Sequence, residues 1–243
     1  EGGLDVEDAA SQSVYGRPTD VGGSDGVVDN FTIDAYNNFQ YHTPADLLPF
    51  GVTAKIAYAP DLDTYGSGNN AGPTQSEGGT AYVGRSATET QIKAAPIDGL
   101  TIGASYFNLD KQGAAKRDQD AESGAYYATY ALNNITVGYS KAYKALLKDN
   151  NTNTGVEYYD QTNMSIAYVV NDDFSVSYEV EKSEANQTLD SEADVEQKST
   201  GIQIAYNMGG MTIAMGRMSH DNPGYSTAVA DEDQTLLAVT MAF

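Results

Sequence analysis

Apolar residues recur at every second position over short segments from residue 30 to the C-terminus. The clearest case is the last segment, residues 234–243, in which alanine or threonine separates Leu237, Val239, Met241 and Phe243. Alternation with period two predicts a β-strand with one apolar face. Taken alone, such a strand fits a soluble sandwich and a membrane barrel equally, because lipid-facing and lumen-facing residues also alternate in a barrel.

Loop length distinguishes these two fold classes. Tight turns are expected at residues 96–99, 133–134, 171–173 and 207–210, and long polar loops at 61–79, 111–122, 145–156, 185–195 and 221–232. Short turns and long loops therefore alternate strictly, as they do when periplasmic turns are tight and extracellular loops are long. We predict an all-β fold, an antiparallel transmembrane β-barrel, of which about eleven strands are present from residue 30 onward.

The composition agrees with a thin outward apolar layer better than with a dense interior. The chain of 243 residues has 18 Tyr and 24 Gly but no Trp and no Cys. The formal net charge of −21 argues against a nucleic acid partner, since like charges repel. Without cysteine there is no disulfide framework and no thiol nucleophile.

One hairpin carries a family resemblance. The segment Asn38-Phe39-Gln40-Tyr41-His42-Thr43-Pro44, followed by Pro49-Phe50-Gly51-Val52 and ending at Tyr58-Ala59-Pro60, resembles the central hairpin of Gram-negative general diffusion porins. The family usually has arginine where this chain has Gln40. The resemblance implies an outer-membrane homotrimer that lets ions and small hydrophilic solutes diffuse passively, without covalent chemistry or cofactors. Its partners would be the bilayer, lipopolysaccharide and the outer-membrane assembly machinery.

The resemblance also implies a sixteen-stranded barrel, whose strand number is even. Residues 30–243 would then supply the equivalents of strands 6 to 16, beginning with a strand over residues 30–41, within one domain. Five strands are expected to precede the first residue, so the N-terminal part would be missing. In chain order, residues 1–29 correspond to the loop that folds into a porin barrel and narrows it.

Charged residues out of phase with the apolar positions are the candidates for the pore lining. On strands these are Asp34, Lys55, Lys93, Glu179 and Glu181, and Gln40 shares their side. Loop position adds Asp5, Glu7 and Asp8 as the acidic side of a constriction. This balance predicts weak cation selectivity. The alternative is that these residues are ordinary solvated strand residues at the barrel rims.

Aromatic residues of the apolar phase fall at two heights. Interfacial aromatic belts are expected in a barrel that spans a bilayer. The membrane-interface candidates are Tyr41, Tyr58, Tyr106, Tyr130, Tyr168, Tyr178, Tyr206 and Phe243. The resemblance further implies that the terminal Phe243 is the recognition signal for insertion into the outer membrane.

Two other functions remain open at this point. A barrel enzyme, such as a lipid hydrolase, would need a nucleophile beside a base, and His220 between Ser219 and Asp221 is the local candidate. An adhesin or surface receptor would instead use the loops. The acidic loop segments 61–63, 118–122 and 192–196 offer oxygen ligands for Ca²⁺ or Mg²⁺, but none has the spacing of a calcium loop, and no cofactor is expected.

Overall fold

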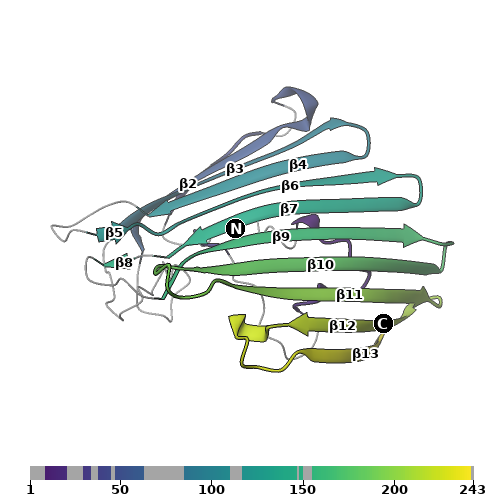
Figure 1. Ribbon diagram of the computed structural model, residues 1–243. Helices are drawn as coiled ribbons and strands as arrows, with labels where there is room; N and C mark the ends of the chain where they lie inside the picture. Colours follow the sequence, from purple (N-terminus) through teal and green to yellow (C-terminus); the bar gives the residue numbers. More distant parts are fainter. Residues whose placement is uncertain are drawn as a thin grey trace.

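The described strands form one antiparallel sheet. The computed structural model describes residues 9–20, 30–33, 38–44, 47–62, 85–109, 117–146, 148–149 and 155–241. Eleven of its strands pair in the order β1-β2-β3-β4-β6-β7-β9-β10-β11-β12-β13 (Figure 1). Their bounds are β1 (Phe39–His42), β2 (Thr53–Leu62), β3 (Arg85–Ile97), β4 (Leu100–Leu109), β6 (Glu122–Leu132), β7 (Ile135–Ala145), β9 (Val156–Val169), β10 (Phe174–Gln187), β11 (Val195–Asn207), β12 (Met211–Asp221) and β13 (Glu232–Met241).

The fold class and the count of eleven strands are confirmed. Each strand pairs with its sequence neighbour in the main sheet, so the sheet is a meander. The short turns lie at one end of the strands, and the longer connections lie at the other end (Figure 1). The last strand ends on the side of the short turns, because Met241 pairs with Met211 at the start of β12.

The first strand is shorter than the sequence predicted. We expected a strand over residues 30–41, but β1 begins at Phe39 and residues 30–33 belong to no strand. Phe31 and Ile33 instead pack on the sheet, and Ile33 is fully buried. An extended segment with one face on a packed surface has the same two-residue period as a strand, so periodicity cannot separate the two.

Two short strands were not expected from the sequence. The strands β5 (Arg117–Gln119) and β8 (Lys148–Asp149) pair with each other between long connections. Two 3-10 turns, η1 (Pro49–Gly51) and η2 (Pro223–Tyr225), lie in the β1–β2 and β12–β13 connections. No helix in the described ranges is long and apolar enough to cross a membrane.

The two faces of the sheet differ in chemistry. One face exposes large apolar side chains, such as Ile166, Ile202 and Leu237. The opposite face carries buried serine, glutamine, asparagine and glutamate side chains together with alanine. A soluble protein rarely exposes so large an apolar surface, whereas a membrane barrel turns its apolar side outward and its polar side inward.

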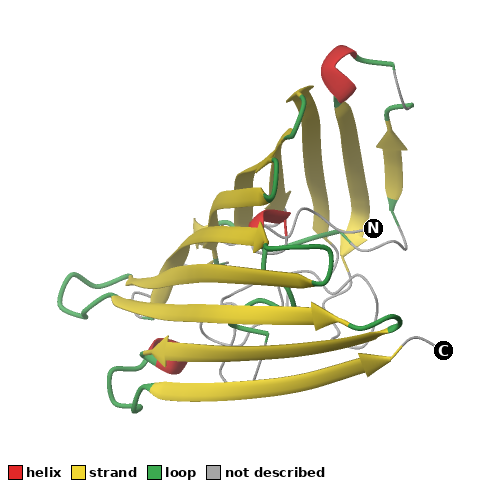
Figure 2. Ribbon diagram, turned by 90° about the vertical axis from the view of Figure 1, so that its right-hand side faces the viewer, coloured by secondary structure: helices red, strands yellow, loops and turns green. Residues whose placement is uncertain are grey.

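The sheet is strongly curved (Figure 2). We call the face that contacts residues 9–20 and 30–33 the inner face, and the opposite face the outer face. A small apolar cluster on the inner face joins Ile33 to the ends of β2, β3 and β4 nearest the long loops, with Phe31 packed against it. Its members are Ile33, Ala57, Ala59, Ala87, Phe107, Leu109 and Ala121.

Candidate functional site on the inner face

Glu179 on β10 is the centre of the contacts that hold residues 9–20 against the sheet. Its side chain has no exposed surface. The Ser11 hydroxyl donates to Glu179 Oε2 over 2.6 Å, and the Ser13 hydroxyl donates to the same oxygen. The other carboxylate oxygen accepts a hydrogen bond of 2.6 Å from Asn163 Nδ2 on β9. These are hydrogen bonds to a charged acceptor, which are stronger than neutral ones.

A second carboxylate binds the end of the same segment. Glu181, which is 1% exposed, accepts from the Thr19 amide over 3.0 Å. Its other oxygen lies 4.0 Å from Arg17 Nη1. The Arg17 guanidinium also forms a two-pronged hydrogen bond with Asp20, with both distances at 2.9 Å.

Side chains of the sheet also bind the backbone of the segment. The Val14 amide donates to Ser177 Oγ over 3.0 Å, and the Tyr15 amide donates to Gln203 Oε1 over 3.1 Å. Gln203 Nε2 in turn donates to the Gly16 carbonyl oxygen. The buried side chains of Ser177 and Gln203 thereby meet the partners that a buried polar group requires.

Glycine allows the segment to approach the sheet closely. A Cβ on Gly138 of β7 would overlap the carbonyl oxygen of Ala10, and a Cβ on Gly201 of β11 would lie 2.9 Å from Pro18 Cγ. The same Ala10 carbonyl accepts a 2.6 Å hydrogen bond from Ser165 Oγ. Residues 9–20 thus lie in direct contact with β7, β9, β10 and β11.

A cationic group lies on the inner face at the other side of the sheet. By register Lys55 is opposite His42 and Gln91, and Lys93 is one step away on β3. His42 Nε2 and Gln40 Oε1 are 3.0 Å apart. A small pocket is lined by Gln40, His42, Lys55, Ile56, Ala57, Glu89 and Gln91.

Residues 30–33 cover the inner face next to this cationic group. The Ile33 amide donates to Glu89 Oε2 over 2.6 Å, and the Phe31 amide donates to Ser123 Oγ over 3.0 Å. The Lys144 ammonium lies 4.2 Å from the centre of the Phe31 ring. The carboxyl group of Glu89 therefore lies beside Lys55 and His42 in the same pocket.

The turn η2 covers the inner face near the long-loop end of β10 and β11. The Tyr225 and Ser183 hydroxyl oxygens are 2.7 Å apart, and the Gly224 amide donates to Gln197 Oε1 over 2.9 Å. The Tyr225 ring packs on Tyr159 with centroids 5.1 Å apart. The β12–β13 connection therefore folds inward over the sheet.

The predicted pore-lining residues have different surroundings. Gln40 and Lys55 are half-buried and Lys93 is exposed. Glu179 and Glu181 lie on the inner face as well, but their carboxylates are covered by residues 9–20 instead of facing solvent. The remaining candidates, Asp5, Glu7, Asp8 and Asp34, lie outside the described residues.

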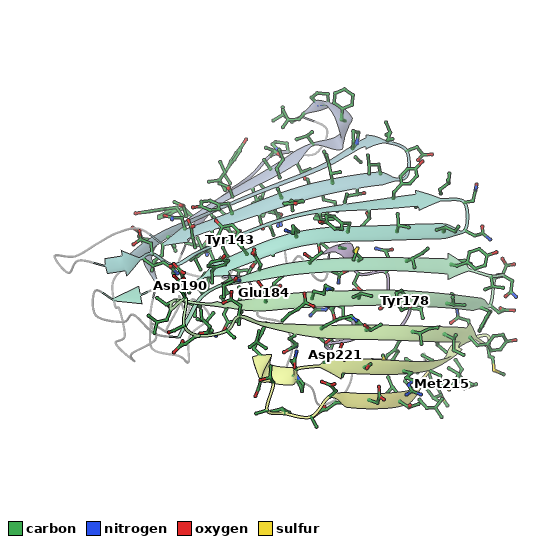
Figure 3. All side chains as sticks on the ribbon, viewed as in Figure 1. Tyr143, Tyr178, Glu184, Asp190, Met215 and Asp221 are labelled. Atoms are coloured by element: carbon green, nitrogen blue, oxygen red, sulfur yellow. The ribbon has the colours of Figure 1, made fainter. Side chains whose placement is uncertain are left out.

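The predicted interface aromatics lie on the outer face. The seven tyrosines are 36 to 58% exposed, which is unusual for so many rings unless another apolar phase covers them. They are Tyr41, Tyr58, Tyr106, Tyr130, Tyr168, Tyr178 and Tyr206. Tyr178 is labelled in Figure 3. Phe243 lies outside the described residues.

Sequence reasoning missed the polar partners of the inner face. Glu89 and Gln203 share the inner phase of Lys93 and Ser199, so the same periodicity contained a signal for them. No signal of this kind existed for Ser11, Ser13 or Arg17, because their segment has no regular period.

The hydrogen-bond partner of His220 differs from the Ser219 that the hydrolase alternative named. His220 Nδ1 lies 2.9 Å from Ser199 Oγ on the neighbouring strand, not from Ser219. Both side chains have no exposed surface. The described residues contain no group of three or more His, Asp or Glu side chains placed to hold a metal ion.

The fold of the chain matches solved outer-membrane proteins. A porin structure superposes with a TM-score of 0.58 at 16% identity, covering all of this chain and 72% of the porin. OmpT, an outer membrane protein of Vibrio cholerae, gives 0.52 at 13% identity over 90% of this chain and 65% of OmpT. A loop L8 deletion mutant of OmpT gives 0.54 at 13% identity, over 98% and 72%. The chain has the fold of an outer-membrane porin.

The chain spans about two thirds to three quarters of the length of these porin-fold structures. In sequence, no protein-family model and no curated protein matches it. In terms of the porin fold, the outer face is the lipid-facing side and the inner face is the lumen side. Residues 9–20 then lie on the lumen side of the barrel wall.

Proposed function

We propose that the protein is a porin of the Gram-negative outer membrane that forms a water-filled channel for passive diffusion of ions and small hydrophilic solutes. The observation that carries the proposal is the contrast between the two faces of the sheet. The polar side chains of the inner face would lack solvation if lipid or another apolar layer covered them. Water in a lumen solvates them.

Residues 9–20 act as part of the constriction in this proposal. They are attached to the lumen side by side chains of three strands, and Glu179 and Glu181 fix them at two points. A segment that is fixed at several points narrows the pore, and it does not move freely enough to block it. Lys55 and Lys93 on the opposite part of the wall supply positive charge.

We further propose that three copies assemble and that the outer face contacts the bilayer and lipopolysaccharide. The exposed apolar and aromatic side chains of that face support the bilayer contact. Insertion would proceed through the outer-membrane assembly machinery. No cofactor takes part in diffusion through a pore.

The channel proposal is tested by conductance. The full-length protein, folded and reconstituted in planar bilayers, should give open channels that insert in groups of three conductance steps. Folding is checked beforehand by the heat-dependent shift in electrophoretic mobility. Absence of ion current from folded protein would contradict the channel, and single unlinked steps would contradict the trimer.

Weak cation selectivity is the first specific prediction. The inner face carries charges of both signs, so we expect the acidic residues Asp5, Glu7 and Asp8 to tip the balance. Lys55→Glu should deepen the preference for cations and Gln40→Arg should reduce it, because charges inside a narrow pore are weakly screened. Reversal potentials in a salt gradient measure both changes.

The control for this prediction is Lys198→Glu, which changes the same charge on the outer face, where Lys198 is paired with Asp221. Lys198→Glu should leave the reversal potential unchanged. Anion selectivity in the parent protein, or equal responses to Lys55→Glu and Lys198→Glu, would show that Lys55 does not line the pore.

A further inference from the structure

Lys141 occupies an unusual position on the outer face. The outer-face residues of β7 are otherwise apolar or aromatic: Ile135, Val137, Tyr139 and Tyr143, with Lys141 between the two tyrosines. In Figure 3, Tyr143 is labelled toward the long-loop end of β7. A lysine on the lipid face of a barrel costs about 2–4 kcal/mol at the bilayer midplane and less near the interface. Such a residue needs an anionic partner or a route to the head groups.

Other cations of the outer face have partners within the protein. Lys182 is paired with Glu196 at 3.0 Å, Lys198 with Asp221 at 3.8 Å and Arg217 with Asp233 at 3.2 Å. Lys141 forms no ion pair with any described residue. The carboxylate position nearest to it by register is Asp160, which is opposite Tyr143 on β9 and therefore diagonal to Lys141.

An apolar hollow lies beside Lys141 on the same face. Its volume is about 380 Å³, and its outer-face lining comes from four strands. One row across these strands contains Ile92, Ala104 and Tyr126, and the next contains Ala94, Ile102, Ala128 and Tyr139. Lys141 is the direct partner of Tyr126 in the register, so it continues the first row. The three alanines leave the space that larger side chains fill elsewhere.

We propose that the hollow and Lys141 together bind one phosphorylated, acylated lipid of the outer leaflet. The hollow takes a segment of acyl chain, and the Lys141 ammonium binds the phosphate. An engineered protein cavity of about 150 Å³ holds benzene, so the hollow has room for a longer stretch of hydrocarbon. Lys141 lies on the half of β7 nearer the long loops, which face outward in the porin orientation.

The combination of groups selects a lipid over a second copy of the chain. An apolar hollow bordered by one cation that pairs with no carboxylate among the described residues matches a molecule that has a hydrocarbon part next to an anion. A second copy would have to supply an apolar surface for the hollow and a separate carboxylate for Lys141, whereas one lipid carries its phosphate next to its acyl chains. The inference rests on the proposed contact of the outer face with lipopolysaccharide, and it does not depend on whether the lumen conducts.

The experiment measures lipid retention by the full-length protein in a zwitterionic detergent, using native mass spectrometry with bisphosphorylated lipid A as the probe. Lys141→Met should weaken binding about tenfold, because one charge-assisted hydrogen bond is lost. Ala104→Phe should weaken it independently by filling the hollow. Arg217→Met is the matched control, because Arg217 is a cation on the same face that already has a partner, and it should leave binding unchanged.

Two further probes separate the parts of the ligand. Lipid A without its phosphates should bind to the parent as weakly as intact lipid A binds to Lys141→Met, and inorganic phosphate alone should not compete. Equal binding by the parent and Lys141→Met, or equal losses in Lys141→Met and Arg217→Met, would overturn the proposal. A chemical crosslink between two copies through Lys141 would also overturn it, since the hollow would then be a protein contact. Heat-dependent mobility confirms that each variant is folded.

Discussion

Single buried carboxylates decide how residues 9–20 sit on the sheet. Glu179 has no exposed surface and receives hydrogen bonds from Ser11, Ser13 and Asn163. Burying a carboxylate is expensive unless it is fully hydrogen-bonded. Glu179 therefore holds the segment against the sheet, and the hydroxyl groups of the segment replace the water that would otherwise solvate the carboxylate.

Glu179→Gln should loosen residues 9–20 without unfolding the sheet. The neutral amide accepts weaker hydrogen bonds, and the loss per bond to a charged group is about 1.5–3 kcal/mol. Hydrogen exchange should become faster at the amides of Val14 and Tyr15, which are bonded to the sheet.

Glu184→Gln is the control for this change, since Glu184 lies on the other face of β10, as its register with Asp160 and Glu196 indicates. Glu184 is labelled in Figure 3. Unchanged exchange in Glu179→Gln, or the same acceleration in both variants, would mean that Glu179 does not anchor the segment.

The strands could be predicted from the sequence, but the packing of residues 9–20 and 30–33 on the sheet could not. Strand count, turn positions and the outward direction of Tyr130 or Tyr206 follow from a two-residue period, which a strand imposes on its side chains. The covering segments obey no such period. Gln203 and Ser177 are paired with backbone atoms of residues 14–16, more than 160 positions away, and nothing local in either sequence encodes that contact.

In the proposed channel, the inward fold of η2 should lower the conductance. Replacing residues 223–229 with a short turn should raise single-channel conductance, because Tyr225 and Gly224 no longer cover Ser183 and Gln197. The loss of these hydrogen bonds should cost about 0.5–1.5 kcal/mol each.

Shortening residues 189–193 is the matched control, because the hydrogen bonds of the described β10–β11 connection join it to nearby loop residues such as Gly155. That variant should keep the parent conductance. If it changes conductance as much as the η2 variant does, the inward fold is not what narrows the pore.

In the molecule as a whole, the strands of the sheet could be predicted from the sequence, and the segments that cover its inner face could not. The antiparallel barrel fold could be predicted from the sequence, because lipid on one face and water on the other require apolar and polar residues to alternate. The absence of a strand over residues 30–33 and the coverage of Glu181 by residues 9–20 could not be predicted. Both features depend on how segments pack on the inner face. A two-residue period does not show whether water or another segment of the chain covers that face.

Assembly in cells is the last prediction. The porin resemblance implies that Phe243 is read by the insertion machinery, and Phe243 continues the outer phase of Leu237, Val239 and Met241. Deleting Phe243 should lower the amount of heat-modifiable barrel in outer-membrane fractions, whereas Phe243→Tyr should keep it near the parent level. Normal levels of the deletion variant would contradict a signal role.

The attachment of residues 9–20 has a consequence for the order of folding. The hydrogen-bond partners of this segment follow 155 to 190 positions later in the chain, on β9, β10 and β11. It has no docking surface until those strands have paired, and closing so long a loop carries an entropic cost. The strands must therefore pair first and residues 9–20 must dock on them afterwards, so the constriction of the proposed channel would be completed late in folding.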